Sequence, residues 1–328
     1  MSAIVTLTLN PALDVSSAID ALSPAIKLRC EPELVDPGGG GLNAARTIAA
    51  LGGDATAVHC SGGDVGRRLQ RLLDREGVTQ RIVPIAGETR ESFAILERRS
   101  GRQYRFVLPG PRLTSSEWRS ALATTVQEVQ EGSWVLASGS LPLGVPADCY
   151  ARLARAVSAV GARLVLDTAG AALEAALRAG VYMVKPNWRE FDALAGAARE
   201  LSEHERRGLA SQLVRDGAAE VVVVTLGARG TRVTTAGGHL EIRPPRVEVD
   251  SPVGGGDSFA GAMLHALASG RPLEAASRFA VAAAAAAVQT PGTAPPRRAD
   301  VERLHRAIGD EHVTRLRLDG GTAPLPVA

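Results

Sequence analysis

The sequence predicts an α/β protein, a doubly wound parallel sheet flanked by helices, with a small separate β-sheet as a lid. Short β-branched runs alternate along the chain with segments rich in alanine, leucine and arginine, as expected for a parallel sheet with crossover helices. Two stretches are strand-like and break this alternation. With 328 residues, the chain can bury a substantial core in one large domain or two smaller ones.

The strands of the main sheet are predicted from short apolar runs of the kind found in buried parallel strands. They are Ile4–Leu9, Ala55–Cys60, Trp134–Ser138, Arg163–Asp167, Met183–Lys185 and Glu220–Thr225. Apolar residues at helical spacing predict the helices between them. They are Leu42–Leu51, Gly66–Glu76, Ser115–Val129, Pro146–Val160, Trp188–Leu194 and Glu203–Asp216.

The lid is predicted from two insertions, residues 14–35 and 82–108, packed over one edge of the main sheet. The polar run at residues 97–102 has the turn residues of a hairpin. One domain is expected over residues 1–310, followed by a C-terminal tail over residues 311–328. The alanine run at residues 282–287 is too short to span a bilayer and predicts a tightly packed helix.

The composition is that of an ordinary soluble globular protein, with 45% hydrophobic and 22% charged residues. A net charge of +2 gives no sign of affinity for nucleic acid or membranes. No stretch has the layout of a signal peptide or the length of a membrane span. The three cysteines show neither zinc-site spacing nor a disulfide framework, which fits a cytoplasmic location.

The basic residues are almost all arginine. Of 37, only Lys27 and Lys185 are lysines, which indicates that an ammonium group is required at these two positions. Chance retention of two exposed lysines is the alternative. The six histidines are scattered, and no role is predicted for any of them.

A glycine-rich turn, Gly254 to Gly256, is followed by Asp257 and an alanine-rich segment that predicts a helix. Glycines allow close approach to the backbone, and the N–H groups of a helix start attract anions. A carboxylate placed there can take a proton from a hydroxyl that attacks phosphorus. The alternative is that Asp257 only caps the helix.

Polar residues follow the predicted strands at their carboxyl ends, where parallel sheets bind ligands. These groups are Asn10 with Asp14, Ser138–Pro142, Asp167–Gly170, Lys185–Asn187 and Thr225–Gly227. Because parallel strands end at the same edge, we expect these groups to meet there.

A second glycine-rich loop, Pro37–Gly41, opens the helix that carries Asn43. It has neither the Walker ending nor the dinucleotide fingerprint, and it suits the hydroxyls or phosphate of a sugar. Arg90 and Arg105 lie on the predicted lid, where they can hold a substrate phosphate. For any single arginine, solvated surface is the alternative.

The segment from Lys185 to Glu190 places an ammonium, an amide and a carboxylate within one turn. Glu190 can position a hydrated Mg²⁺ near nucleotide phosphates. The alternative is a first-turn glutamate favoured only by the helix dipole.

Together these segments resemble the ribokinase/PfkB family of carbohydrate kinases, over about residues 4–310. The matching segments are Asn10–Asp14, Gly38–Gly41 with Asn43, Ser138–Pro142, Lys185–Asn187 with Glu190, and Val253–Asp257. Within the family the chain is similar to the bacterial minor, PfkB-type 6-phosphofructokinases at Lys27–Cys30, Pro37–Gly41 and Tyr104–Gly110. The resemblance implies a ribokinase-like fold and ATP-dependent phosphorylation of O1 of fructose 6-phosphate.

The resemblance also implies roles for individual residues. Asp257 would be the base, beside an anion hole of backbone N–H groups from Gly254, Gly255 and Gly256. The sugar phosphate would be held by Asp14, Gly38, Gly39, Asn43, Arg90, Arg105 and Ser140, with Lys27 reaching a neighbouring subunit of a lid-paired homodimer. ATP would contact Lys185, Asn187, Thr225 and Gly227, and Glu190 would organise Mg²⁺. A K⁺ loop would involve Ser251, Val253 and Gly292.

The chain departs from the family pattern next to the proposed base. The usual Gly-Ala-Gly-Asp is Gly-Gly-Gly-Asp, and Pro252 replaces a common threonine, which removes one backbone donor. Related 1-phosphofructokinases and tagatose-6-phosphate kinases usually carry lysine where this chain has Gly40, which favours the 6-phosphofructokinase interpretation. A sugar-phosphate or nucleotide sensor and a nucleoside or plain-sugar kinase are the remaining alternatives.

Overall fold

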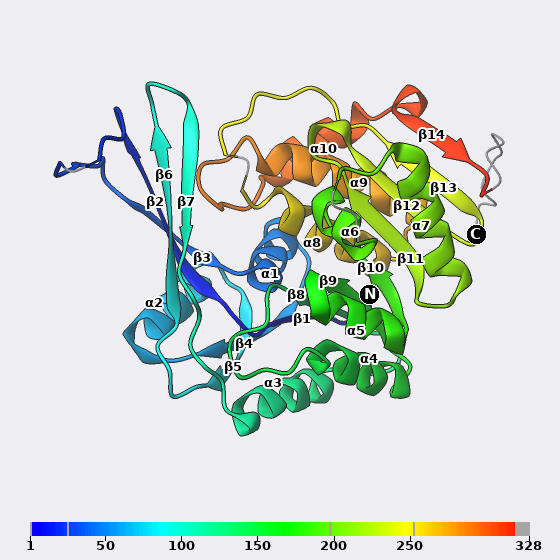
Figure 1. Ribbon diagram of the computed structural model, residues 1–328, viewed down its shortest axis with the longest axis horizontal. Helices are drawn as coiled ribbons and strands as arrows, with labels where there is room; N and C mark the ends of the chain where they lie inside the picture. Colours follow the sequence, from blue (N-terminus) through cyan, green and yellow to red (C-terminus); the bar gives the residue numbers. More distant parts are fainter. Residues whose placement is uncertain (1, 25, 197–198, 252, 319–328) are drawn as a thin grey trace.

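The computed structural model describes residues 2–24, 26–196, 199–251 and 253–318. Within them, the main sheet has ten strands in the order β14-β13-β12-β11-β10-β9-β8-β1-β4-β5, and a second sheet has four in the order β3-β2-β6-β7 (Figure 1). The strands of the main sheet are β1 Ile4–Thr8, β4 Thr56–Ser61, β5 Thr79–Pro84, β8 Trp134–Ser138, β9 Arg163–Asp167, β10 Val181–Val184, β11 Ala219–Thr225, β12 Thr231–Thr235, β13 Gly238–Ile242 and β14 Val313–Leu316. From β11 to β5 all neighbours are parallel, which confirms the predicted fold class.

Helices cover both faces of the main sheet. One face packs against α1 Gly40–Ala50, α8 Gly255–Ala268, α9 Leu273–Ala287 and α10 Arg298–Arg306. The other packs against α3 Ser115–Gln127, α4 Cys149–Ala159, α5 Gly170–Ala179, α6 Trp188–Leu194 and α7 Glu203–Arg215. The helix α2 Gly63–Arg75 packs beside α1 and β4. Because both faces are covered, β1 is buried along its whole length, which explains why no charged residue interrupts it.

The second sheet is the small lid. Its strands are β2 Ala12–Ile19, β3 Leu34–Gly38, β6 Arg90–Glu97 and β7 Arg102–Val107, and β6 and β7 form an antiparallel hairpin across the polar turn at residues 97–102. The two insertions join through the parallel pair β2–β6. In Figure 1 these strands rise at the left, away from the main sheet. Residues 82–84, expected in the lid, instead belong to β5 of the main sheet.

The main sheet also extends past residue 310, where the tail was expected to begin. Residues 313–316 form β14, which pairs with β13 at the sheet edge. They add to an antiparallel extension that starts with β12 and β13, and none of these strands was predicted from the sequence. Residues 319–328 of the expected tail lie outside the described residues. Over the part of the chain that is described, no helix has both the length and the apolar character needed to cross a bilayer.

Helices α1 and α8 cross at very short range because Gly261 has no side chain. A Cβ atom at this position would lie 2.5 Å from the Ala44 carbonyl oxygen and 3.0 Å from the Ala44 Cα. The hydroxyls of Thr47 and Ser258 form a 3.2 Å hydrogen bond across the same crossing. The crossing places the first turns of both helices, each opened by a glycine-rich loop, beside one another.

We therefore expect Gly261→Ala to destabilise the protein by about 1–3 kcal/mol, the usual cost of overpacking a core. Alanine gains about 1 kcal/mol of helix propensity over glycine, but the clash is with backbone atoms that cannot rotate away. Gly208→Ala is the matched control, because a methyl group added at this exposed glycine of α7 would meet no atom within 4 Å. Urea unfolding should show Gly208→Ala unchanged or stabilised. Equal stability of the two variants would contradict the close crossing.

Candidate active site

The turn before α8 places Asp257 inside the first helical turn. Gly254 is the N-cap in a left-handed conformation, with φ of 82°, and it makes no side-chain capping bond. Asp257 is the third residue of the helix, so the alternative in which it merely caps α8 does not hold. The first N–H groups of an α-helix have no partner within the helix and carry partial positive charge. The turn therefore combines an anion-attracting backbone with a carboxylate.

The Asp257 carboxylate is held by a residue from the other helix. Asn43 Nδ2 donates to Asp257 Oδ2 at 2.9 Å across the α1–α8 crossing. Burial raises the pKa of Asp257, and the nearby Asp167 adds to the rise, while the Asn43 hydrogen bond, Lys185 and Arg105 oppose it. A half-buried carboxylate with a raised pKa is suited to act as a general base.

Arg46 fixes the orientation of the Asn43 amide. Its Nη1 donates to Asn43 Oδ1 at 3.1 Å, so the amide nitrogen must face Asp257. The Arg46 side chain is buried and also donates to the carbonyls of Pro37 and Thr293, both at 3.0 Å. Its remaining nitrogens bind the carboxylates of Glu76 and Asp36. One guanidinium thus ties α1 to the lid strand β3 and to the loop after α9.

Lys185 lies at the carboxyl edge of the sheet, just after β10. Its side chain is only 6% exposed, and its Nζ lies 3.1 Å from Asp167 Oδ2 at the end of β9. Burial alone would lower the pKa of Lys185, but Asp167 and Asp257 outweigh it and the pKa is raised. The ammonium group is therefore charged and adjacent to Asp257. From the sequence, Asp167 was expected among the strand-end residues, but no role was predicted for it.

A cavity of about 990 Å³ opens beside this pair. Its lining brings together several residues predicted for ATP, metal and catalysis. They are Lys185, Asn187, Glu190, Thr225, Gly227, Gly255, Gly256, Asp257 and Arg105. Such a volume is in the range of ligand sites for drug-sized or larger molecules, typically about 300–1,000 Å³.

Asn187 and Glu190 form a capping box at the start of α6. The Asn187 side chain accepts from the N–H groups of Arg189 and Glu190, at 3.0 and 3.1 Å, and Glu190 Oε2 accepts from the Asn187 N–H at 2.9 Å. Burial raises the pKa of Glu190, while the Asn187 backbone hydrogen bond opposes the rise. The capping box therefore accounts for the position of Glu190 Oε2. The same side chain also lines the large cavity.

The oxygen ligands that this part of the large cavity offers fit a Mg²⁺ ion that keeps most of its bound water. No group of three or more His, Cys, Asp or Glu side chains that could hold a metal occurs among the described residues. Mg²⁺ at nucleotide sites is commonly bound by one or two carboxylates, by phosphates and by water. A single carboxylate such as Glu190 is compatible with that mode and not with an all-protein cage.

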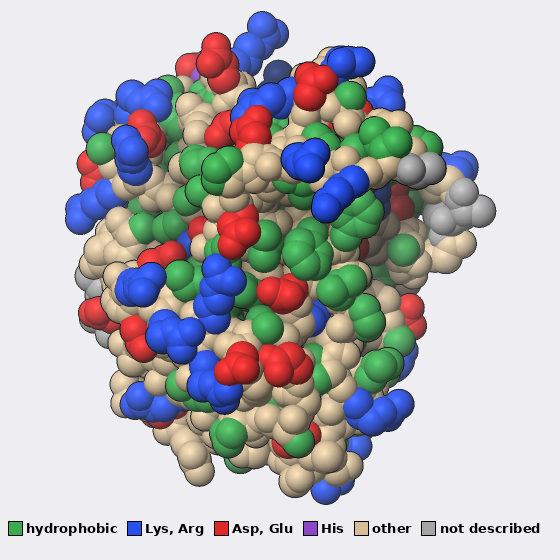
Figure 2. Space-filling model, turned by 90° about the vertical axis from the view of Figure 1, so that its left-hand side faces the viewer, with side chains coloured by type: hydrophobic (Ala, Val, Ile, Leu, Met, Phe, Trp, Pro, Cys, Tyr) green, Lys and Arg blue, Asp and Glu red, His purple; other side chains and the backbone are tan. Residues whose placement is uncertain are grey.

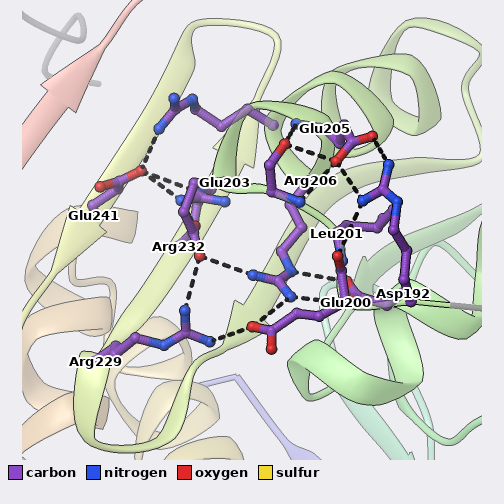
Figure 3. A network of polar contacts seen from close by, with 12 residues as sticks. Asp192, Glu200, Leu201, Glu203, Glu205, Arg206, Arg229, Arg232 and Glu241 are labelled. Atoms are coloured by element: carbon purple, nitrogen blue, oxygen red, sulfur yellow. Dashed lines mark hydrogen bonds and ion pairs between the residues drawn. The ribbon is translucent and has the colours of Figure 1, made fainter. Parts of the chain in front are cut away.

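A network of charged residues supports the wall that carries Asn187 and Glu190 (Figure 3). The buried Arg206 of α7 binds both oxygens of Asp192 of α6, at 2.8 and 2.7 Å. Glu203 accepts from Arg206 and also from Arg229 and Arg232. The network joins α6, α7 and β12, so it fixes the first turn of α6 relative to the cavity.

A second, smaller cavity lies between the lid and the main sheet. Of the predicted residues it is lined by Asp14, Arg105, Ser251, Val253 and Gly292. Polar residues that were not predicted from the sequence also line it, namely Ser16, Asp36, Ser92 and Gln103. Their positions on neighbouring lid strands were the available signal. Arg105, which is exposed, lines both cavities and so lies where they adjoin.

Asp14 lies against the glycine-rich loop Pro37–Gly41. A Cβ atom at Gly38 would lie 2.4 Å from Asp14 Oδ2, so the lack of a side chain lets the loop approach this carboxylate in its present orientation. Burial raises the pKa of Asp14 to about 6; Arg105 opposes the rise and Asp257 adds to it. Asp14 therefore takes up a proton close to neutral pH.

The two glycine-rich loops meet at Gly40. A Cβ at this position would lie 2.1 Å from Ser138 Oγ and 3.1 Å from Asp257 Oδ1. Gly39, the N-cap of α1, has a φ of 116°, a conformation open to glycine. The predicted strand-end groups therefore do converge, with Asp257 at their centre.

Other predicted residues lie at the margins of the two cavities. Arg90 is half-buried and donates from its two Nη atoms to the carbonyls of Leu108 and Asn10, both at 3.1 Å, which leaves its Nε without a partner among the described residues. Ser140 is exposed and accepts from Asn10 Nδ2 at 3.1 Å. Lys27 is exposed on the segment between β2 and β3 and lines neither cavity.

The loop predicted to bind K⁺ is tied together by Ser251. Its Oγ donates to the Gly292 carbonyl at 2.9 Å and accepts from the Val253 N–H at 3.3 Å. These bonds bring the segment before α8 against the segment after α9. Pro252, the departure from the family pattern, lies outside the described residues.

Comparison with known proteins agrees with this arrangement. Residues 13–300 match the pfkB family carbohydrate kinase. The chain is 42% identical over 301 residues to the ATP-dependent 6-phosphofructokinase isozyme 2 of Mycobacterium tuberculosis, covering 92% of this chain and 88% of the relative. Phosphofructokinase-2 from Escherichia coli in complex with potassium superposes with a TM-score of 0.89 at 39% identity, covering 94% of this chain and 99% of that one. The same enzyme in complex with fructose-6-phosphate gives 0.87 at 38% identity, with the same coverage.

The matched region includes both glycine-rich loops, the sheet edge between them and the lid. The family that the sequence motifs predicted is therefore confirmed, and the chain belongs to the pfkB family of carbohydrate kinases.

Proposed function

We propose that this protein transfers the γ-phosphoryl group of ATP to O1 of fructose 6-phosphate and forms fructose 1,6-bisphosphate. The observation that carries the proposal is the Asp257 carboxylate, held by Asn43 at the first turn of α8 beside the Lys185 ammonium. A sensor has no need of such a base. The names of the relatives, 6-phosphofructokinase and phosphofructokinase-2, support this acceptor over other sugars.

In the proposed reaction Asp257 accepts the proton of the O1 hydroxyl as that oxygen attacks the γ-phosphorus. The O1–phosphorus bond forms while the bond from phosphorus to the bridging oxygen of ADP breaks. The N–H groups of Gly255 and Gly256 at the start of α8 and the Lys185 ammonium stabilise the negative charge on the phosphoryl oxygens. Gly254 gives the turn its left-handed geometry.

The sugar phosphate is proposed to bind where the two cavities adjoin, at Arg105, because the smaller cavity of about 20 Å³ holds little more than one water. Asp14, Gly38, Gly39 and Asn43 are assigned to the sugar; of these, Asp14 lines the smaller cavity, and Asn43 is bonded to Asp257. The 6-phosphate is assigned to Arg105, Arg90 and Ser140. Arg105 supports this best, because its exposed guanidinium lines the cavity. Arg90 offers its unpartnered Nε, since both Nη atoms are used by backbone carbonyls.

ATP is proposed to occupy the large cavity against Lys185, Asn187, Thr225 and Gly227. Mg²⁺, when bound, neutralises phosphate charge, and Glu190 holds one of its waters. K⁺ is assigned to the loop of Ser251, Val253 and Gly292, a proposal supported by the potassium complex of the E. coli relative. The catalytic unit is proposed to span residues 1–310 together with β14. A cytoplasmic location is proposed because the three cysteines are unpaired.

A homodimer through the lid is proposed because the lid exposes large apolar side chains. Ile26, Leu34, Phe106 and Val107 are each more than half exposed, at 64%, 52%, 52% and 58%. Figure 2 looks onto the lid side of the molecule, where apolar side chains gather between charged ones. In this dimer Lys27 is assigned to the substrate cavity of the second copy, since it lines neither of these two cavities of its own chain.

Coupled assays with several acceptors test the proposed reaction. We expect kcat/KM to be highest for fructose 6-phosphate, lower for fructose 1-phosphate and tagatose 6-phosphate, and lowest for ribose and adenosine, which leave the lid arginine unpaired. Asp257→Asn should fold normally and lose at least about 10²-fold in kcat, because a positioned base contributes about 10²–10⁴-fold.

If fructose 1-phosphate or tagatose 6-phosphate were preferred, the proposed acceptor would be wrong, although the protein would still be a sugar-phosphate kinase. Near-normal turnover of Asp257→Asn would remove the base assignment. Substrate binding without ADP release in the unaltered protein would support the sensor. Repeating the assay with K⁺ replaced by tetramethylammonium tests the cation loop, where unchanged activity would argue against it.

Sedimentation equilibrium tests the lid dimer. We expect the unaltered protein to be a dimer and Phe106→Asp to be a monomer, because a charge cannot be buried unpaired in an apolar interface. Leu143→Asp is the matched control, since Leu143 is 57% exposed but lies outside the lid. A monomeric unaltered protein, or equal dimerisation of the two variants, would contradict the proposal.

A further inference from the structure

A separate small cavity lies on the side of the sheet covered by α8, α9 and α10, next to the C-terminal end of α1. Its volume is about 140 Å³. Basic and imidazole side chains dominate its lining, with one carboxylate among them. They are His265, Arg271, Arg298, His305, Arg306 and Glu302. His265 lies eight residues after Asp257 on α8, about 12 Å along the helix at 1.5 Å per residue, so this cavity is distinct from the catalytic one.

The positive charge in this cavity is not compensated by its surroundings. Glu302 accepts from Arg298 Nε at 2.8 Å and is thereby engaged. Arg271 and Arg306 have no ion-pair partner among the residues that the structure describes. Two exposed guanidinium groups with free N–H donors therefore border a partly open cavity.

The side chains around the cavity are held by an aromatic ring. The Arg271 guanidinium lies 4.6 Å from the centre of the Phe279 ring, and the His305 ring packs edge-on against the same ring at 5.5 Å. The Phe279 and His305 rings both line the cavity, so an anion bound there would meet an imidazole as well as the guanidinium groups.

Helix dipoles do not explain this cluster. Cations are favoured at helix C-termini, and that accounts for Arg306, the last residue of α10, and for Arg271, just after α8. Arg298 is the first residue of α10, and its ion pair with Glu302 at i+4 accounts for it. The dipole predicts no cavity. A ligand of negative charge accounts for a cavity that is bordered by two unpaired guanidinium groups.

We propose that this cavity is a binding site for a small phosphate-bearing anion. The forked N–H donors of arginine match phosphate oxygens in pairs. The volume is about ten times the 10–15 Å³ that one water requires, and about one seventh of the large cavity. It has room for inorganic phosphate or the phosphate of a short ester and is too small to enclose a whole nucleotide.

Histidine side-chain ¹⁵N NMR tests this site separately from the active site, because His265 and His305 line this cavity and neither of the other two. Inorganic phosphate and glycerol 3-phosphate serve as probes, added to the full-length protein. We expect the signals of both histidines to shift with one common midpoint for each probe. Tighter binding of glycerol 3-phosphate would show that the carbon portion is also held. Equal midpoints would assign the recognition to phosphate alone.

Substitutions identify the groups that bind. The double variant Arg271→Ala, Arg306→Ala should weaken the binding of both probes at least tenfold. Arg303→Ala is the matched control, because Arg303 lies on the same helix but binds Asp300 and does not line the cavity. Absence of a shift, or equal weakening in the control and the double variant, would overturn the proposal.

Discussion

The close crossing of α1 and α8 is the constraint on which the site depends. Gly261 lets the two backbones approach, and the approach brings Asn43 within hydrogen-bond distance of Asp257. Each helix begins with a glycine-rich loop, so the crossing also brings the two loops together. The carboxylate and the anion-attracting amides are thereby fixed by packing in the core.

Buried charges then set the orientation of the groups at this crossing. Arg46 determines which way the Asn43 amide faces, and Asp167 does the same for the Lys185 ammonium. Asp257 lies between them, with its pKa raised by burial and restrained by Asn43 and Lys185. Removing either positioning charge would leave a buried polar group without its partner, which is costly in a core.

Sequence patterns predicted the parts of this arrangement that local chemistry determines. Strands buried on both faces and strand-end residues such as Lys185 follow from short-range signals. The antiparallel extension through β14 was missed because β12 and β13 mix polar and charged residues with apolar ones, and because β14 follows a long stretch of helices. The roles of Arg46 and Asp167 were missed because they depend on partners distant in sequence. Glu190 shows a further limit of prediction from sequence, because the same residue belongs to a capping box and also lines a cavity.

The pH dependence of kcat in Asn43→Ala tests the central claim most directly. Asn43 donates to the ionised form of Asp257 and lowers its pKa, so its loss should raise that pKa and move the acid limb of kcat to higher pH. Thr47→Val removes another hydrogen bond of the same crossing without touching Asp257, and should leave the limb in place. An acid limb of kcat that stays at the same pH, or moves to lower pH, in Asn43→Ala would contradict the account.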